Sequence, residues 1–247
     1  MTQRELFLRH VAQTSSAPLA LEIIKADCAT LYDAAGKEYI DLIGGISVAN
    51  IGHRHPKVIE AIQKQLDAYL HIMVYGEFVE APQVQYAKLL TEYLPSALNA
   101  VYFTNSGAEA VEGAMKLAKR VTNRTQIIAF NHSYHGSTQG ALSIIGDEYW
   151  RNAFRPLLPD VLHLAYNNFD SLNEISGQTA CVIAETVQAE AGIKVPDTAW
   201  IQALRKKCTE TGTLLILDEI QAGFGRTGKL WGFEHFDIVP DVLLLGK

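Results

Sequence analysis

The stretch Thr213–Gln221, with the sequence TLLILDEIQ, has the pattern of a strand buried on both faces of a parallel sheet. Its apolar run from Leu214 to Leu217 is uninterrupted, and Asp218 follows at once. In open α/β sheets, ligands bind just outside the carboxyl ends of the strands. Asp218 therefore lies where such a fold places its chemistry, although an isolated Asp at this position more often caps a turn.

The rest of the chain from about Gln83 alternates between helical and strand patterns. Helices are predicted over 84–93, 108–121 and 198–210, the last closed by Gly212. Strands are predicted over 100–103, 126–130, 161–165, 180–184 and 214–218. Alternation of this kind predicts an α/β fold with a mostly parallel sheet covered by helices.

The first part of the chain has a different pattern. Residues 3–13 have the spacing of a short helix, and Leu21–Asp41 is typical of a small antiparallel hairpin unit around Ala34–Lys37. Pro56 suits the first turn of a helix that follows. The N-terminal region therefore predicts a small α+β segment.

Composition excludes several classes of protein. The 247 residues carry a net charge of −6 and no basic run, so no nucleic-acid partner is expected. Cys28, Cys181 and Cys208 are far apart and none lies in a CxxC pair, which favours a reducing, cytoplasmic setting over a disulfide framework or zinc site. No apolar run approaches a membrane span, and the N-terminus lacks a signal-peptide core, so no membrane association is expected.

The loop Thr104–Glu109 joins a predicted strand to a predicted helix. Ser106 and Glu109 have the spacing of a capping box, which alone explains both residues. The same turn points the N–H groups of Gly107 and Ala108 out of a helix N-terminus, a position suited to a phosphate. The two interpretations are compatible.

Two further loops follow predicted strands. In His132–Ser137, Tyr134 offers an aromatic face to a planar ring, although plain packing is the more common role. The two histidines there lack a nearby third ligand, so no metal site is expected. Glu185 and Glu190 follow another strand and are expected to line a pocket at the carboxyl edge of the sheet.

The segment Gly223–Lys229 reads GxxxxGK, which is close to the phosphate loop of nucleoside triphosphatases. Such an NTPase is an alternative class. Leu230 stands where a Ser or Thr would bind Mg²⁺, and Trp231-Gly232 is a poor helix start. The acidic strand also precedes the loop directly, whereas in those enzymes it is a separate, later strand.

Taken together, five stretches resemble the class III aminotransferases, pyridoxal-phosphate enzymes with the aspartate-aminotransferase-like fold. These stretches are NSGAEAVEGAMKLAKR, YHGST, ETVQAEAG, LLILDEIQAGFGRTG and DVLLLGK, in the family's order and spacing. The early stretch DLIGGISVANIGHRHPKVIEAI is similar as well. The resemblance implies a seven-stranded type of sheet, with residues 1–55 belonging to a small domain and 56–247 to an incomplete large cofactor-binding domain.

The resemblance also implies roles for individual residues toward pyridoxal 5'-phosphate. Lys247 would form the Schiff base and carry the proton, and Asp218 would pair with the pyridine nitrogen and keep it protonated. The remaining implied cofactor contacts are Ser106, Gly107 and Ala108 at the phosphate, Tyr134 and Ile220 on the two ring faces, Gln221 at the ring oxygen, and Glu185 in the pocket.

Three departures from the family pattern bear on the expected function. Ser137 stands where many members that act on ornithine-like substrates have Arg, and Thr186 replaces the usual Pro. The chain stops at Lys247, whereas family members continue, so a fragment of a longer protein is expected.

The expected activity is a transaminase that moves an amino group from an amine or ω-amino acid to a 2-oxo acid. Candidate donors are 4-aminobutyrate, ornithine and acetylornithine, and candidate acceptors are 2-oxoglutarate and pyruvate. An aminomutase or racemase on the same scaffold is the alternative. A homodimer or larger homo-oligomer in the cytoplasm is expected.

Overall fold

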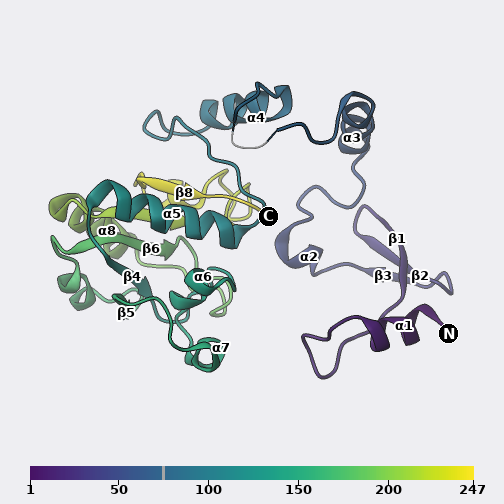
Figure 1. Cartoon of the computed structure of the whole chain (residues 1–247), viewed down its shortest axis with the longest axis horizontal. Coiled ribbons are helices and arrows are strands. Elements are labelled where there is room, and N and C mark those ends of the chain that lie inside the picture. The colour runs from purple at the N-terminus through teal and green to yellow at the C-terminus, as the bar shows by residue number, and fades with distance from the viewer. Residues whose placement is uncertain (74–75) are drawn as a thin grey trace. The chain divides into compact units, whose positions relative to one another are not determined.

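The computed structural model describes residues 1–73 and 76–247, which form two compact units, Met1–Phe78 and Val79–Lys247. Figure 1 shows the elements of both. The division between units falls after Phe78. The assignment of residues 1–55 to a small domain stays a prediction.

The smaller unit is built around a three-stranded antiparallel sheet with the order β1-β2-β3. The predicted turn at Ala34–Lys37 joins β2 to β3, and the Asp33 carboxylate accepts hydrogen bonds at 2.9 Å from the N–H groups of Ala35 and Lys37. The elements are α1 (Gln3–His10), β1 (Ile23–Asp27), β2 (Thr30–Asp33), β3 (Glu38–Ile40), α2 (Gly44–Ser47) and α3 (Pro56–Ala68).

The larger unit contains a five-stranded sheet with the order β5-β4-β6-β7-β8, in which each neighbouring pair is parallel. This confirms the predicted α/β class. Its strands are β4 (Gln126–Phe130), β5 (Val161–Leu164), β6 (Thr179–Glu185), β7 (Leu214–Asp218) and β8 (Val242–Leu244). Its helices are α4 (Ala81–Glu92), α5 (Gly107–Thr122), α6 (Gln139–Ser143), α7 (Glu148–Arg151), α8 (Thr198–Thr211), and the 3₁₀ turns η1 (Asn152–Phe154), η2 (Asp170–Glu174) and η3 (Gly232–His235).

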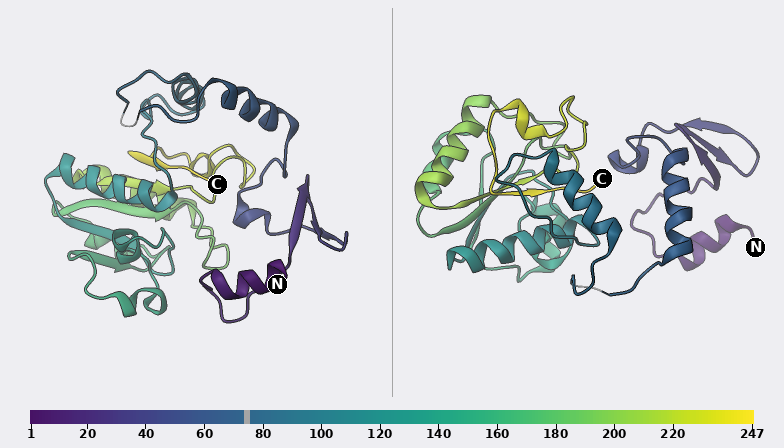
Figure 2. Two further views of the ribbon diagram at one scale, coloured as in Figure 1. Left: turned by 45° about the vertical axis from the view of Figure 1, so that its right-hand side comes forward. Right: turned by 90° about the horizontal axis from the view of Figure 1, so that it is seen from above.

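Helices α5 and α8 cover opposite faces of this sheet (Figure 2). Alternate residues of β4 follow the two faces: Ile127 packs in the cluster that includes α5, whereas Ile128 packs in the cluster that includes α8. Trp200 of α8 is fully buried, and its indole N–H donates to the Asn168 carbonyl at 2.9 Å. Both faces of the strands are therefore buried, as the uninterrupted apolar runs predicted.

One predicted strand is absent from this sheet. Ala100–Phe103 has strand-like composition, yet it is irregular, and β8, paired with β7, lies at the edge of the sheet among the described residues. A strand is stabilised by hydrogen bonds to a neighbour, so composition alone does not place a segment in a ladder. Within the described part of the chain the sheet accordingly has five strands, where a seven-stranded type was expected.

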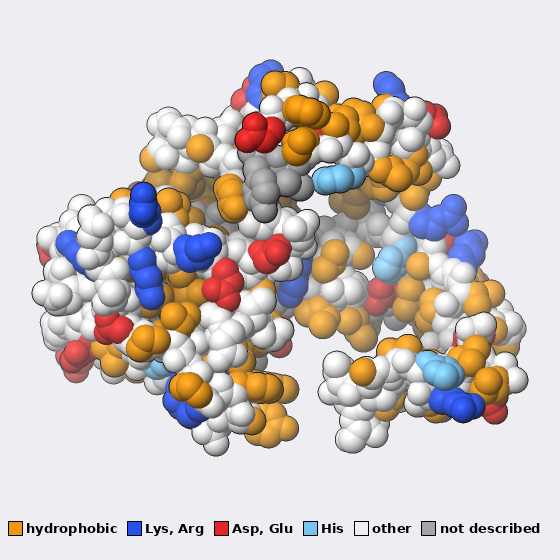
Figure 3. All heavy atoms as spheres, in the orientation of Figure 1, with side chains coloured by type: hydrophobic (Ala, Val, Ile, Leu, Met, Phe, Trp, Pro, Cys, Tyr) orange, Lys and Arg blue, Asp and Glu red, His pale blue; other side chains and the backbone are white. Residues whose placement is uncertain are grey.

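Large hydrophobic side chains lie at the surface of both units (Figure 3). On α3, the side chains of Val58, Ile62 and Leu66 remain half-exposed. On α4, Val84 and Leu89 are similarly exposed. Among the described residues, no helix is both long and apolar enough to cross a membrane.

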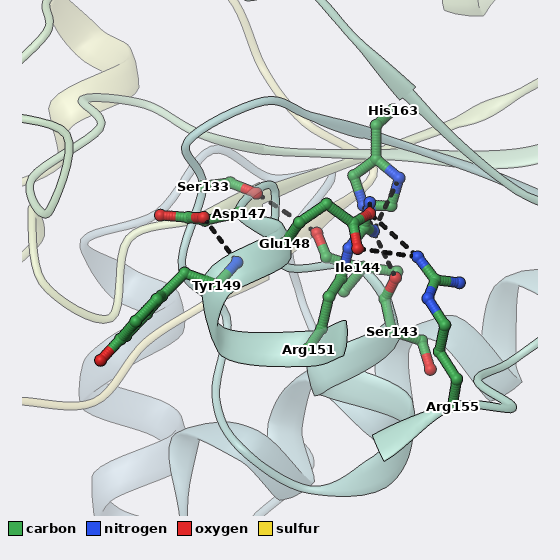
Figure 4. A network of polar contacts seen from close by, with 9 residues as sticks. All are labelled: Ser133, Ser143, Ile144, Asp147, Glu148, Tyr149, Arg151, Arg155 and His163. Atoms are coloured by element: carbon green, nitrogen blue, oxygen red, sulfur yellow. Dashed lines mark hydrogen bonds and ion pairs between the residues drawn. The ribbon is translucent and has the colours of Figure 1, made fainter. Parts of the chain in front are cut away.

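A polar network ties α7 to the edge strand β5 (Figure 4). The Arg151 guanidinium contacts the His163 imidazole at 2.7 Å and forms an ion pair with Glu148. Arg155 binds the same carboxylate at 2.8 Å. Burial, and then the Arg151 charge, lower the pKa of His163 to about 4.

This network predicts acid-sensitive stability. The unfolded chain protonates His163 near pH 6.5, whereas the folded chain does so only near its depressed pKa. The contribution of neutral His163 to the free energy of unfolding is therefore complete above pH 6.5, and it is lost as the pH falls toward 4. His163→Gln is expected to flatten this part of the pH dependence, measured by urea unfolding across that window. The exposed His71→Gln serves as the control, and equal slopes in all three proteins would contradict the assignment.

Candidate active site

The carboxyl edge of the sheet brings together the ends of β6, β7 and β8. Asp218 pairs in register with Glu185 on one side and with Leu244 on the other. Both carboxyl side chains are buried, at 5% exposure for Asp218 and 6% for Glu185. The predicted placement of Asp218 at a strand end is confirmed, and its burial shows that it is more than a solvated turn residue.

Asp218 is held by two hydrogen bonds from separate parts of the chain. Its Oδ1 accepts from the Ile220 N–H at 3.1 Å, and its Oδ2 lies 2.7 Å from Nδ1 of His135. The His135 side chain is fully buried, and its Nε2 has no partner among the described residues. Sequence reasoning considered His135 only as a metal ligand and missed this contact, because the two residues are 83 positions apart.

Glu185 fixes the loop that carries Tyr134. Its Oε1 accepts from the Tyr134 N–H at 2.9 Å, and its Oε2 accepts from the Ala189 N–H at 3.2 Å. Burial raises the pKa of Glu185 to about 7, a shift that the nearby His135 opposes. The Tyr134 side chain stays 44% exposed, which leaves its aromatic ring accessible to a ligand.

The predicted anion site lies at the start of α5. Ser106 is the N-cap, and its hydroxyl accepts from the Glu109 N–H at 3.2 Å. The predicted capping box is only half correct, because the Glu109 carboxylate accepts from the Asn105 N–H at 2.7 Å. The first helical bond runs from Ala110 to Ser106, so the N–H groups of Gly107 and Ala108 lie outside the helical ladder.

Close contacts join this helix start to the other loops. A Cβ added to Gly107 would lie 2.9 Å from Cδ1 of Ile220, and one added to Gly246 would lie 3.1 Å from Cγ2 of the same side chain. A Cβ added to Gly136 would lie 2.7 Å from Cβ of Ala108. The α5 start, the loop after β4 and the residue before Lys247 therefore surround Ile220 and Ala108.

Lys247 lies beyond β8 at the same edge of the sheet. Its Nζ donates to Oε1 of Gln221 at 3.1 Å, and the side chain is only partly buried. Figures 1 and 2 show this end of the chain beside one end of α5. The structure thus brings together the α5 start, the loop after β7 and Lys247, as the resemblance implied.

Two further carboxylates support the site, and sequence reasoning gave neither a role. Glu219 is fully buried and accepts from the Thr186 hydroxyl at 2.8 Å and from the N–H groups of Gly232 and Phe233 at 2.7 Å each. Burial raises the pKa of Glu219. Thr186, one of the departures from the family pattern, supplies a hydrogen bond that proline lacks.

The second of these carboxylates belongs to Glu112 on α5. It accepts from the Thr138 hydroxyl at 2.7 Å and from the Gly140 N–H at 2.9 Å, which caps the start of α6. The segment between β4 and α6 is thereby fixed at its α6 end.

The phosphate-loop alternative is wrong for Gly223–Lys229. After this loop the chain forms the short 3₁₀ turn η3, and Lys229 Nζ donates to the Glu234 carbonyl at 2.8 Å. A nucleotide phosphate loop requires a helix whose N-terminus faces the phosphates. The helix N-terminus at this site is that of α5.

Comparisons with known proteins agree with this geometry. The family described as Aminotransferase class-III matches residues 11–247. The chain belongs to the class III aminotransferase family. It is 42% identical to an acetylornithine aminotransferase from Methanopyrus kandleri, over 100% of this chain and 63% of that relative.

Solved structures of transaminases share the fold. A transaminase from the marine bacterium Virgibacillus has a TM-score of 0.89 at 28% identity, over 97% of this chain and 60% of its own. An ornithine aminotransferase from Toxoplasma gondii, with partial occupancy of pyridoxal phosphate at its active site, has a TM-score of 0.85 at 30% identity, over 97% and 58%. This class III chain thus spans about 60% of the length of the proteins it matches.

Class III aminotransferases use pyridoxal phosphate, and the residues at this edge suit that cofactor. The N–H groups at the α5 start suit a phosphate, and the Lys247 amine suits an aldehyde. The buried Asp218 carboxylate suits a protonated ring nitrogen. The site therefore contains a complementary group for each reactive part of the cofactor.

Proposed function

We propose that the protein that contains this chain is a pyridoxal-phosphate-dependent aminotransferase. The observation that carries the proposal is the meeting of three features at one sheet edge. These are the α5 start, the buried Asp218 and the Lys247 amine, linked through Ile220 and Gln221. Together they suit the phosphate, the ring nitrogen and the aldehyde of pyridoxal phosphate.

The bound cofactor supplies an electron sink for the carbanion formed at the substrate carbon. Ser106, Gly107 and Ala108 hold its phosphate in this proposal. Asp218 keeps a proton on the ring nitrogen through a charge-assisted hydrogen bond. These groups fix the position of the ring before any reaction occurs.

The remaining residues orient the ring and move protons. Tyr134 and Ile220 confine the two ring faces, and Gln221 donates to the ring oxygen. Lys247 would be the attachment point for the cofactor, and its amine would move the proton at the reacting carbon. Glu185 holds the backbone of Tyr134, so it contributes to the pocket wall.

The proposed donors are 4-aminobutyrate, ornithine and acetylornithine, with 2-oxoglutarate or pyruvate as acceptor. The sequence similarity to an acetylornithine aminotransferase supports this group of substrates. Ser137, which is exposed, provides no guanidinium for a carboxylate, in contrast to the Arg expected for ornithine-like substrates. An aminomutase or racemase is the alternative, and amino transfer that depends on an added oxo acid distinguishes the transaminase from both.

The proposal includes the setting of the enzyme. The three cysteines are free, which supports a reducing, cytoplasmic compartment. The hydrophobic side chains exposed on α4 support a homodimer or larger homo-oligomer. Its other partners are the small-molecule amine and oxo acid.

The experiment that tests the proposal is covalent labelling. The purified chain, incubated with pyridoxal phosphate and then reduced with borohydride, is expected to gain one cofactor mass on Lys247, located by peptide mass spectrometry. Lys229 is the internal control, because its amine already binds the Glu234 carbonyl. Label spread over surface lysines, or none on Lys247, would contradict the proposal.

A further inference from the structure

Two carboxylates follow one another at the end of β7, and they face opposite sides of the sheet. Successive residues of a strand alternate between faces, and Ile216 and Leu217 do so here, in the clusters that include α5 and α8 respectively. Asp218 therefore points to the α5 side. Glu219 follows on the α8 side, where its carboxylate binds the backbone of Phe233, a member of the cluster that includes α8. The two acidic groups thus serve different parts of the site.

The Glu219 carboxylate is bound by three hydrogen-bond donors. The residue has no exposed surface. Its Oε1 accepts from the Thr186 hydroxyl at 2.8 Å and from the Phe233 N–H at 2.7 Å, and its Oε2 accepts from the Gly232 N–H at 2.7 Å. Burial raises the pKa of Glu219, and these three hydrogen bonds oppose that rise. Three donors suit an ionised carboxylate, because a protonated one would need an acceptor for its own proton.

The backbone of Glu219 holds the turn 218–223 from two more directions. Its N–H donates to the Leu244 carbonyl at 3.0 Å, and its carbonyl accepts from the Gly223 N–H at 2.9 Å. The first bond joins the turn to the end of β8, and the second closes the turn itself. Glu219 therefore connects this turn to the end of β8 and, through its side chain, to the residue after β6 and to η3.

The packing around Glu219 leaves little room for the turn to shift. A Cβ added to Gly232 would lie 3.1 Å from Oε1 of Glu219 and 3.2 Å from Cγ2 of Thr186. A Cβ added to Gly223 would lie 2.9 Å from the Glu219 carbonyl oxygen. Thr186 stands where the family usually has Pro, which has no hydroxyl to donate. This chain therefore holds Glu219 with one donor more than a proline at that position allows.

We infer that Glu219 is a positioning residue of this site, whose carboxylate, held by its three donors, anchors the turn 218–223 from the α8 side. The turn carries Asp218, Ile220 and Gln221, which are proposed to contact the ring of the cofactor. Among the described residues, the Glu219 carboxylate forms no hydrogen bond with those three, so it acts on the cofactor only through the turn. This inference rests on the proposed function where it concerns the cofactor, but the anchoring of the turn does not.

The first test needs no cofactor and measures amide hydrogen exchange in the purified chain by NMR. Glutamine at position 219 keeps the size of the side chain, removes its charge and turns an NH₂ group toward a backbone donor. The amides of Ile220 and Gly223 form no hydrogen bond with the Glu219 carboxylate. We expect these two amides to exchange about 10- to 100-fold faster in Glu219→Gln, because the turn loses its anchor.

Glu174→Gln is the matched control for the exchange measurement, because Glu174 is an exposed carboxylate in η2. It should leave the exchange rates of the turn unchanged. The amides of β4 are the internal reference for general destabilisation. Acceleration confined to Gly232 and Phe233, or equal acceleration in β4, would overturn the inference.

The second test titrates pyridoxal phosphate into three variants and follows visible absorbance. Thr186→Val keeps the shape of threonine and lacks the hydroxyl, whereas Thr186→Ser keeps the hydroxyl. We expect a loss of affinity of about 10- to 100-fold for Glu219→Gln and of about 3- to 10-fold for Thr186→Val, with Thr186→Ser within about 2-fold of wild type. Wild-type affinity in Glu219→Gln, or equal affinities in the two Thr186 variants, would overturn the positioning role.

The two tests separate this inference from the proposed function. If the wild-type chain takes up no cofactor while exchange in the turn depends on Glu219, the proposed function fails and the anchoring stands. If the wild type binds cofactor and exchange in the turn does not respond to Glu219→Gln, only the inference on Glu219 fails. Should Glu219→Gln fail to fold, exchange in the Thr186 variants decides: faster exchange in Thr186→Val alone supports the anchor, and equal rates in both overturn it.

Discussion

Replacing Asp218 by asparagine is expected to leave the fold intact and to remove most of the amino transfer. Asparagine has nearly the same size and still hydrogen-bonds, so the packing around β7 should persist. The negative charge that keeps the ring nitrogen protonated is lost, and loss of such an electrostatic partner costs on the order of 3 kcal/mol in the barrier. Turnover should therefore fall by about 100-fold or more.

The measurements are oxo-acid-dependent amino transfer and thermal unfolding, both in the cofactor-loaded protein. Asp170→Asn is a suitable control, because Asp170 is an exposed carboxylate in η2 and is not among the groups that hydrogen-bond Asp218. We expect the control to match the wild type in both measurements. Turnover of Asp218→Asn within a few-fold of wild type would show that Asp218 is a structural residue only.

The second large effect is expected for Gly136→Ala. Gly136 has φ of +120°, a backbone conformation that L-residues rarely adopt, and a Cβ there would lie 2.7 Å from Cβ of Ala108. Backbone strain alone costs roughly 1–3 kcal/mol, and relief of the clash requires movement of the α5 start. Together these effects should lower the free energy of unfolding by about 3 kcal/mol, or roughly 5–10 °C in Tm.

Gly136→Ala should also weaken phosphate binding, because the displaced N–H groups belong to the proposed anion site. Thermal unfolding and titration with pyridoxal phosphate measure the two effects separately. Gly177→Ala is the matched control: its φ is not in the left-handed region and a Cβ there meets nothing within 4 Å. If the Gly136→Ala variant proved as stable as the Gly177→Ala variant, the described packing of the loop after β4 against α5 would be contradicted.

Local sequence determined the elements whose stabilisation is local or periodic. Strand β4 has the predicted bounds, and α8 ends at Gly212, which has φ of +62° as a C-cap glycine allows. One exception is Ala100–Phe103, which has strand composition and no ladder, and another is β8 (Val242–Leu244), which was not predicted. A segment forms a strand only where it hydrogen-bonds to a neighbouring strand. The composition of Ala100–Phe103 alone was therefore insufficient to predict one.

The candidate site shows the same division between what the local sequence predicts and what it does not. The residues at the strand ends indicated a pocket at the carboxyl edge, because strand ends of a parallel sheet meet at one edge. Only the resemblance implied that Ser106, Tyr134, Asp218 and Lys247 hold a cofactor there. The resemblance then supplied the individual roles, which the contacts of Ile220 and Gln221 make geometrically consistent.

The sequence by itself determined the α/β class, the edge of the sheet that carries the chemistry, and the residue types available there. Only the tertiary structure decided which of those residues touch. His135 appeared as one of two histidines in a loop until folding placed it against Asp218, and Glu219 appeared as a second acid until it proved to hold the Gly232 backbone. Periodicity reports burial along one element, whereas such contacts depend on the register between strands and on loops closed over many residues.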